Sequence, residues 1–477
     1  MSFGKGLLAG LANSIWGTLV ALAVVPVYVR YLGVEAYGLI GFFATTQAVL
    51  QILDLGLAPT VNREVARCRV AGEPDRARTL VHTLAAAYWA TAGLLAAGSL
   101  FVGPVVARHW LRAGALPQET VAAAVTLIGI VIACRWPTNI YLGALMGAER
   151  LVEASWLGIA ATTASSLGAV AILAFVSSSL QGFFLWQAAV GLAYALASRW
   201  AAWRVLGRPR RVRAEGSVLR GVVRFSAGMS AIAVLGLLST QLDKLLLSRL
   251  LSLQDLGRYT LAAMVAGSLS VVIAPVFNGL FPRFSALAAT GDTAGLAALY
   301  RTSARLLGGA LFPIVVFLHS GGEGFLRLWL SEPDLARAVA PVAVLLAAGT
   351  ALHGVMYVPY ALLLAFGRTR LALAQAAIFL ATLAPLMIVG SLRGGMRGGA
   401  LAWLVAQALY VLYGTWITHR HLLTGMGWGW LARDVGIPLT LSLGVGAAGG
   451  ALLRATVASP ASSVVTAAGL AAIASAL

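Results

Sequence analysis

The chain of 477 residues is 60% hydrophobic and only 10% charged, and its formal net charge is +18. A soluble domain carries about 25% charged residues, so this composition excludes a water-soluble globular protein. It predicts an all-α integral membrane protein, in which the excess of Lys and Arg is a topology signal and requires no nucleic-acid partner. The two cysteines, Cys68 and Cys134, form no metal-binding pattern, and no disulfide between them is expected.

Apolar runs of about 20 residues, each long enough to cross a bilayer, recur along the whole chain. The first run resembles a signal peptide with a cleavage site near Ala23, but it continues to Val29 and has a counterpart later in the chain, so we expect it to be retained. The runs predict fourteen transmembrane helices, at about residues 7–29, 38–58, 80–107, 119–147, 151–176, 180–203, 222–249, 256–281, 303–319, 335–366, 371–391, 398–418, 434–454 and 461–477.

An internal repeat organises these helices. Identical residues recur at a spacing of 219 in the pairs Arg30 and Arg249, Gly38 and Gly257, Gly72 and Gly291, and Tyr141 and Tyr360. Each copy holds six spans, an even number, so we expect the copies to be related by an axis along the membrane normal. The predicted domains are a six-helix lobe at 1–206, a basic cytoplasmic linker at 207–221, a second six-helix lobe at 222–421, and two additional transmembrane helices at 422–477.

The distribution of basic residues predicts the orientation. About two thirds of the Lys and Arg residues fall on the side of the N-terminus, which places both termini in the cytoplasm. No outer loop exceeds roughly 20 residues, which leaves no room for an extracytoplasmic catalytic or receptor domain.

Ionisable residues at bilayer depth are costly and usually face an interior cavity. Arg135 lies near the centre of the fourth span, Asn139 shares its helix face, and Pro137 between them predicts a local break. In the second copy, His353 lies at a similar depth, followed at helical spacing by Tyr357. Two cation-capable side chains at matching depth predict a basic cavity between the lobes. The alternative is a structural Arg bonded to backbone carbonyls and a neutral His in the core.

Further polar residues complete the predicted cavity. Gln51 and Asp54 share one face of the second span with Gln47, at spacings i, i+4 and i+7. Asp243 and Lys244 are adjacent in the seventh span and point about 100° apart, so at most one of them faces a cavity directly. Amide and hydroxyl groups also hold membrane helices together, which is the competing interpretation. The remaining candidates for substrate binding are Asp243, Lys244, Gln51, Asp54, Asn278 and Asn13.

Three segments carry a resemblance to a known family. They are LDKLLLSRLLSLQDLGRYTLA at 242–262, LDLGLAPTVNREVAR at 53–67 and LFPRFSAL at 280–287. They resemble the polysaccharide transporter branch of the multidrug/oligosaccharidyl-lipid/polysaccharide (MOP) exporter superfamily. The pattern is most similar to the Wzx-type flippases of O-antigen or exopolysaccharide repeat units, over about residues 1–420.

The resemblance implies two six-helix lobes around a central cavity, in the bacterial cytoplasmic membrane. It implies that undecaprenyl-diphosphate-linked oligosaccharide moves from the inner to the outer leaflet by alternating access. It also implies cationic cavity residues, for which the positions of matching depth and type are Arg135, His353, Lys244, Arg30 and Arg249.

Other functions stay open. The two extra helices resemble those of lipid-linked peptidoglycan-precursor flippases, which keeps lipid II as an alternative substrate. A drug/cation antiporter of the same fold would need a carboxylate at cavity depth, whereas Asp54 and Asp243 lie nearer the ends of their spans. A membrane polymerase or ligase acting on the same lipid is less favoured, because it should carry a large outer loop.

The chain is expected to be a transporter and no enzyme. It has no Gly-rich phosphate loop, CxxC or HExxH motif, so no cofactor or metal site is expected. The expected partners are the lipid-linked oligosaccharide, membrane lipids, and H⁺ or Na⁺ as a coupling ion. His353 is the candidate for proton coupling, because the reference pKa of histidine, about 6.5, lies between the pH values on the two sides of an energised membrane.

Overall fold

The computed structural model describes residues 3–54, 56–207, 234–424, 426–456 and 460–476. Within these residues the chain is helical throughout, and nine helices are long and apolar enough to cross a membrane. Several of them present large apolar side chains outward: Leu94, Phe101 and Phe175 are 75%, 77% and 88% exposed. Lipid is the solvent that such faces require. The prediction of an all-α, multi-pass membrane protein is confirmed.

The chain divides into two compact units. Unit 1 comprises Met1–Gln241 with Ser252–Gln254, and unit 2 comprises Leu242–Leu251 with Asp255–Leu477. The helix at 234–250 therefore contributes to both. The predicted domain limits at 206, 221 and 421 stay a prediction. Residues 208–221 of the predicted linker and 222–233 of the seventh span lie outside the described residues.

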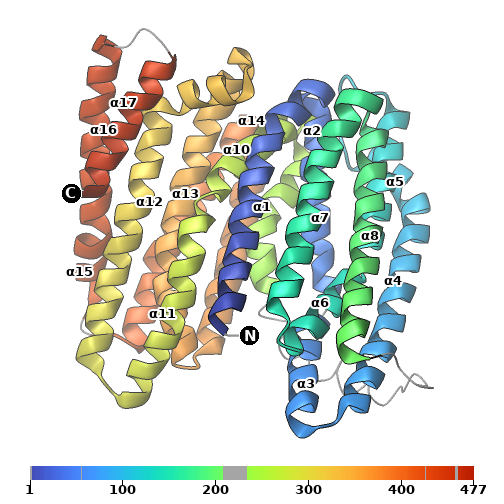
Figure 1. Cartoon of the computed structure of the whole chain (residues 1–477). Coiled ribbons are helices and arrows are strands. Elements are labelled where there is room, and N and C mark those ends of the chain that lie inside the picture. Colours follow the sequence, from blue (N-terminus) through green and yellow to red (C-terminus); the bar gives the residue numbers. More distant parts are fainter. Residues whose placement is uncertain (1–2, 55, 208–233, 425, 457–459, 477) are drawn as a thin grey trace. The chain divides into compact units, whose positions relative to one another are not determined.

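Unit 1 is a bundle of helices in which α4 packs on α5, α5 on α8, and α1 on α7 (Figure 1). The short amphipathic α3 packs on α6 at one end of the bundle. The helices of unit 1 are α1 (Phe3–Leu32), α2 (Val34–Leu50), α3 (Leu57–Ala71), α4 (Pro74–His109), α5 (Gln118–Arg135), α6 (Thr138–Gly147), α7 (Leu151–Ala171, extended by a π-helical turn at Ile172–Val176) and α8 (Leu180–Leu206).

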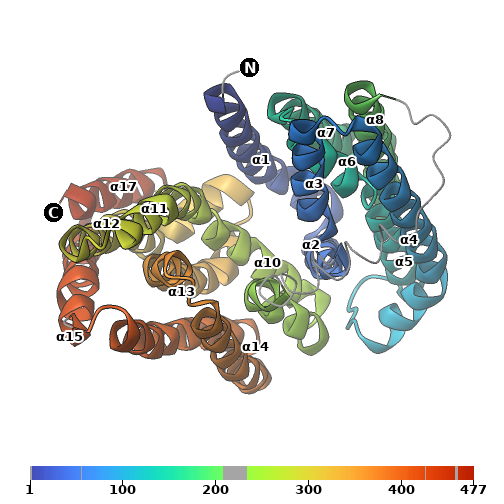
Figure 2. The same cartoon turned by 90° about the horizontal axis from the view of Figure 1, so that it is seen from below.

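Unit 2 is built around α12, which packs on α13 and α11 and also on the two C-terminal helices, α16 and α17 (Figures 1 and 2). The two additional helices predicted from the sequence are thus integrated into this unit. Its helices are α10 (Leu253–Gly267), α11 (Ser270–Thr290), α12 (Thr293–Leu330), α13 (Pro333–Ala365), α14 (Thr369–His421), α15 (Gly427–Trp430, continued by a π-helical segment at Leu431–Gly436), α16 (Ile437–Thr456) and α17 (Pro460–Ala476).

The internal repeat is visible in the helix boundaries. The starts of α2 and α10 differ by 219 residues, and so do those of α4 and α12. Before α4 and α12 the chain turns through Gly72 and Gly291, whose φ values are +70° and +69°. Glu73 N–H donates to the carbonyl of Cys68, and 219 residues later Asp292 N–H donates to that of Leu287. This C-terminal cap needs a left-handed residue, which explains why glycine recurs at this position.

Helix α14 reverses direction at two residues with non-helical backbone angles, Gly394 and Gly395. Its two segments correspond to the predicted spans 371–391 and 398–418. They touch through backbone at Gly390 and Gly398, where a Cβ atom on either glycine would lie within 2.5 Å of the carbonyl oxygen of the other. No residue with a side chain fits this contact, so the reversal depends on the two glycines.

Two predicted spans differ from the observed helices. The second span was predicted to reach residue 58, but α2 ends at Leu50 and a 3₁₀ turn follows over Gln51–Asp54. The chain then changes direction at Gly56, which has a φ of +72°. The eighth span was predicted as one helix at 256–281 but is divided between α10 and α11 near Ser268. The predicted break at Pro137 is confirmed, because α5 ends at Arg135 and α6 begins at Thr138.

We expect Gly147→Val to destabilise unit 1 by about 1–3 kcal/mol, which should lower its thermal unfolding temperature by several degrees. A Cβ atom at Gly147 would lie 2.4 Å from the backbone oxygen of Asn62, where α6 crosses α3. Thermal unfolding in detergent measures the effect. Gly93→Val is the matched control, because a Cβ atom at Gly93 meets nothing within 4 Å. Equal unfolding temperatures for the two variants would contradict this packing.

Candidate functional site

The helix break in unit 1 positions Arg135. The backbone N–H of Trp136 still donates to the carbonyl of Ile132, but Pro137 has no N–H to continue the helix. Helix α8 makes room for the long side chain with Gly191, where a Cβ atom would lie 2.8 Å from Cγ of Arg135. The guanidinium is therefore held inside the bundle at the break.

Two amide oxygens and one aromatic ring hold the Arg135 guanidinium. It donates to Oε1 of Gln187 on α8 at 2.5 Å and to Oε1 of Gln47 on α2 at 3.2 Å. It also lies 5.4 Å from the ring centroid of Phe43. Within the described part of the chain no carboxylate pairs with this guanidinium. Neutral partners satisfy some of its donors but leave its charge uncompensated, so an anion would bind here favourably.

His353 in unit 2 has a similar environment. Its Nδ1 lies 3.2 Å from Oε1 of Gln407 on the second segment of α14. Because a carbonyl oxygen only accepts, Nδ1 carries the hydrogen, and Nε2 of the neutral ring is left as a proton acceptor. Four aromatic rings lie with their centroids 5.3 to 6.5 Å from the imidazole: Tyr357, Phe379, Trp403 and Tyr410.

Arg135 and His353 occupy equivalent places in the repeat. After α6 and α13 the chain turns through left-handed residues at Glu149 and Gly367, so the spacing of the repeat has become 218 there. At that spacing Arg135 corresponds to His353. In each unit the basic side chain is bonded to a glutamine, Gln187 or Gln407, on the helical segment that ends the six-span repeat. We call these two pairs the basic–glutamine pairs.

The sequence analysis missed both glutamines. Each is almost fully buried, at 5% and 0% exposure, in an otherwise apolar helix. Gln187 and Gln407 are 220 residues apart, close to the spacing of the repeat. That pairing of buried amides is the signal that could have identified them.

The carboxylates among the candidates are bonded to tyrosines. Asp243 is 3% exposed and accepts hydrogen bonds from the Tyr259 hydroxyl at 2.9 Å and from Nζ of Lys244 at 3.4 Å. Asp54 accepts from the Tyr88 hydroxyl, and also from the backbone N–H of Ala58 at the start of α3. The observed contacts of both residues lie within their own units, which gives each a structural role.

The other candidates are more peripheral to the basic–glutamine pairs. Asn139 is half-buried on α6, one turn after Arg135, and Asn13 packs against Gly158 of α7. Gln51 and Asn278 are exposed. Among the described residues, none of these four amides is hydrogen-bonded to Arg135 or His353. The searched part of the chain also contains no group of three His, Cys, Asp or Glu side chains that could hold a metal ion.

We expect Tyr259→Phe to destabilise the protein by about 1–3 kcal/mol, because Asp243 would stay buried without its hydroxyl donor. Chemical or thermal unfolding in detergent measures the change. Tyr31→Phe serves as the control, since Tyr31 is exposed. An unfolding curve for Tyr259→Phe that overlays that of Tyr31→Phe would show that Asp243 does not depend on this bond.

Comparison with known proteins places these features in a family. The pattern of the family described as polysaccharide biosynthesis proteins matches residues 3–288, more than half of the chain. The chain belongs to this family. Comparison with curated proteins finds no match.

Solved structures share the fold of this polysaccharide biosynthesis family member. The lipid II flippase MurJ, in an inward closed conformation, superposes with a TM-score of 0.71 at 12% identity, over 99% of this chain and 98% of that one. A multidrug resistance MATE transporter of the MOP superfamily, facing inward, gives 0.67 at 16% identity, over 86% and 96%. A MATE transporter from Vibrio cholerae gives 0.60 at 16% identity, over 88% and 97%. The chain has a MOP-type transporter fold, as the sequence predicted.

Proposed function

We propose that the protein is a flippase for undecaprenyl-diphosphate-linked oligosaccharide, which it moves from the inner to the outer leaflet of the bacterial cytoplasmic membrane. The observation that carries this proposal is the Arg135 guanidinium, which has amide partners and no carboxylate partner among the described residues. A diphosphate supplies the missing negative charge and accepts several N–H donors at once.

The basic–glutamine pairs divide the work between the units. A guanidinium stays protonated at all physiological pH values, so Arg135 is suited to bind the diphosphate throughout the cycle. An imidazole gains and loses a proton near neutrality, so His353 is suited to carry H⁺. The polar residues Asn139, Lys244 and Gln51 remain proposed secondary contacts for the sugar or the diphosphate.

Lipid II is the second candidate substrate. The fold matches the lipid II flippase MurJ over nearly the full length of both chains, whereas the match to the MATE transporters leaves more than a tenth of this chain uncovered. Lipid II also carries a diphosphate, so the basic–glutamine pairs suit either lipid. A cation/drug antiporter fits less well, because the buried carboxylate Asp243 is bonded to Tyr259 and Lys244.

The decisive experiment identifies the lipid that accumulates when the protein is lost. In a deletion strain we expect an undecaprenyl-diphosphate-linked oligosaccharide to build up on the cytoplasmic face, with the lipid II level unchanged. Purified protein in liposomes should flip the same lipid. Accumulation of lipid II would assign the second candidate, and normal levels of both lipids with impaired drug efflux would contradict a flippase.

A further inference from the structure

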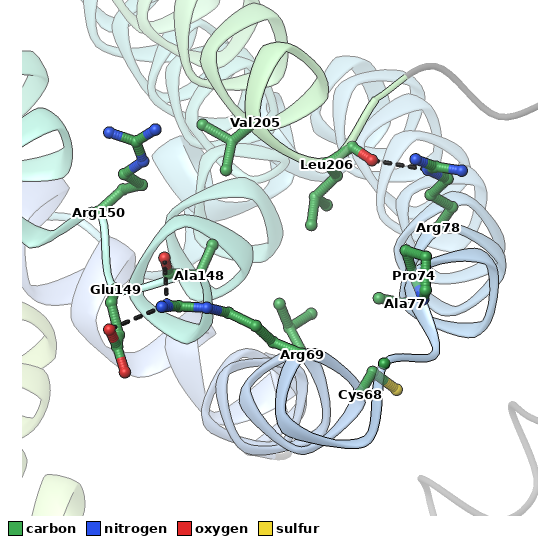
Figure 3. Close-up of a pocket in the computed structure, with 12 residues that line it drawn as sticks. Cys68, Arg69, Pro74, Ala77, Arg78, Ala148, Glu149, Arg150, Val205 and Leu206 are labelled. Carbon is green, nitrogen blue, oxygen red and sulfur yellow. Dashed lines mark hydrogen bonds and ion pairs between the residues drawn. The ribbon is translucent and has the colours of Figure 1, made fainter.

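A pocket of about 650 Å³ lies at the end of unit 1 that the sequence places in the cytoplasm (Figure 3). It is formed where the α3–α4 turn, the α6–α7 turn and the end of α8 meet. Its apolar lining comes from Val65, Ala77, Val205 and Leu206, and its charged lining from Arg69, Arg78, Arg150 and Glu149.

The arginines of this pocket exceed its acids. Arg69 donates to the carbonyl of Ala148 at 3.0 Å and pairs with Glu149 at 2.9 Å. Arg78 donates to the carbonyl of Leu206 at 2.6 Å and to Asp75 at 2.7 Å. The two carboxylates are 75% and 91% exposed, so these ion pairs are weak and a phosphate could replace them.

Cys68 adds no negative charge to the pocket. Its burial raises the pKa of its thiol, which keeps the group protonated at neutral pH. The lining therefore carries three positive charges against the single charge of Glu149.

Unit 2 contains the equivalent pocket, and this provides an internal control. That pocket, of about 460 Å³, is lined by Leu287, Ala288, Gly291, Thr293, Leu296 and Ala297, which are the positions of Cys68, Arg69, Gly72, Pro74, Ala77 and Arg78 shifted by 219. The turn closes with the same backbone hydrogen bonds in both units. Alanine thus suffices where unit 1 has Arg69 and Arg78, so the fold of the turn does not require the two arginines.

We propose that the pocket of unit 1 binds the phosphodiester headgroup of an anionic membrane phospholipid. The guanidinium groups suit a phosphate, and the apolar lining beside them suits the first carbons of an amphiphile. The ends of α4 and α8 that build the pocket belong to apolar helices long enough to span the membrane, so the site lies where lipid headgroups are found. This site is separate from the basic–glutamine pairs and does not depend on the transported substrate.

The test measures binding of dioleoyl phosphatidylglycerol to delipidated protein in detergent by native mass spectrometry. The variant R69A/R78A copies the residues of the equivalent pocket, and we expect it to bind this lipid about 30-fold more weakly, from the loss of two cationic groups near a lipid surface. R69K/R78K should retain most of the affinity. R301A is the matched control, because Arg301 lines the pocket of unit 2, and it should bind like the unaltered protein.

Two further probes separate the sources of the phosphate. Dioleoyl phosphatidylcholine has the same chains without net charge and should bind weakly and equally to all variants. Soluble glycerol phosphate should not compete with the lipid at millimolar concentration. Competition by glycerol phosphate, an equal loss of binding in R301A, or unchanged binding in R69A/R78A would each overturn the proposal.

Hydrogen exchange on the unaltered protein gives a measurement that needs no variant. Phosphatidylglycerol should slow amide exchange in residues 65–78 and 148–150, and should leave 287–301 unchanged. Equal protection of both segments, or of neither, would overturn the proposal even if R69A/R78A failed to fold.

Discussion

Arg135→Gln is expected to lower the transport of lipid-linked oligosaccharide by about 100-fold, whereas Arg135→Lys should retain part of it. Glutamine can keep one hydrogen bond to Gln187 but removes the charge that we propose meets the diphosphate, and a charged hydrogen bond is worth about 1.5–3 kcal/mol. Lysine keeps the charge but loses the planar fork of donors. The measurement is the rate of flipping in liposomes, with each variant at equal density.

The control is Arg199→Gln, because Arg199 is an exposed arginine on the same helix as Gln187. It should transport normally. The unfolding temperatures of all three variants must be compared, since Arg135 also joins α2, α5 and α8. If Arg135→Gln is folded and transports at the parental rate, the guanidinium is a structural link and does not bind substrate.

The second large effect is expected at His353. Glutamine at this position can still donate to Oε1 of Gln407, but it cannot take up a proton. We expect His353→Gln to abolish the response of transport to an imposed proton gradient. One charge carried across 100 mV is worth about 2.3 kcal/mol, so the parental protein should lose up to about 50-fold in its accumulation ratio without the gradient.

Transport is measured between about pH 5.5 and 8, which brackets the reference pKa of histidine, with and without the gradient. His421→Gln is the matched control, since His421 is exposed at the end of α14. A His353→Gln protein with the parental pH profile and the parental gradient dependence would exclude the coupling role. It would leave the aromatic surroundings of His353 as helix packing.

Much of this architecture could be predicted from local signals. Hydrophobic run length identified most spans, Pro137 identified the break in the fourth, and Gly72 and Gly291 identified the repeat. The end of α2 could not be predicted in this way, because residues 51–58 remain apolar overall. Its position is set by the left-handed Gly56 and by the cap that Asp54 provides to α3.

The partners of the candidate residues were harder to predict. Arg135 and Gln187 are 52 residues apart, and His353 and Gln407 are 54 apart, so no helical periodicity connects them. The spacing of the repeat also changes from 219 to 218 between the two copies, which placed Arg135 opposite Gly354 in the sequence comparison. Similarly, nothing local shows that Tyr259 holds Asp243, because that bond joins two separate helices.

The glycine reversal in α14 also bears on how the protein is assembled. The chain between Gly390 and Gly398 is so short that closing it costs little entropy, and the touching glycines have no side chains to order. The two segments can therefore meet as soon as both have left the ribosome, before α15 to α17 are synthesised. We expect them to enter the bilayer together as one helical hairpin, with Gln407 and the ring of Tyr410 already in place to receive His353.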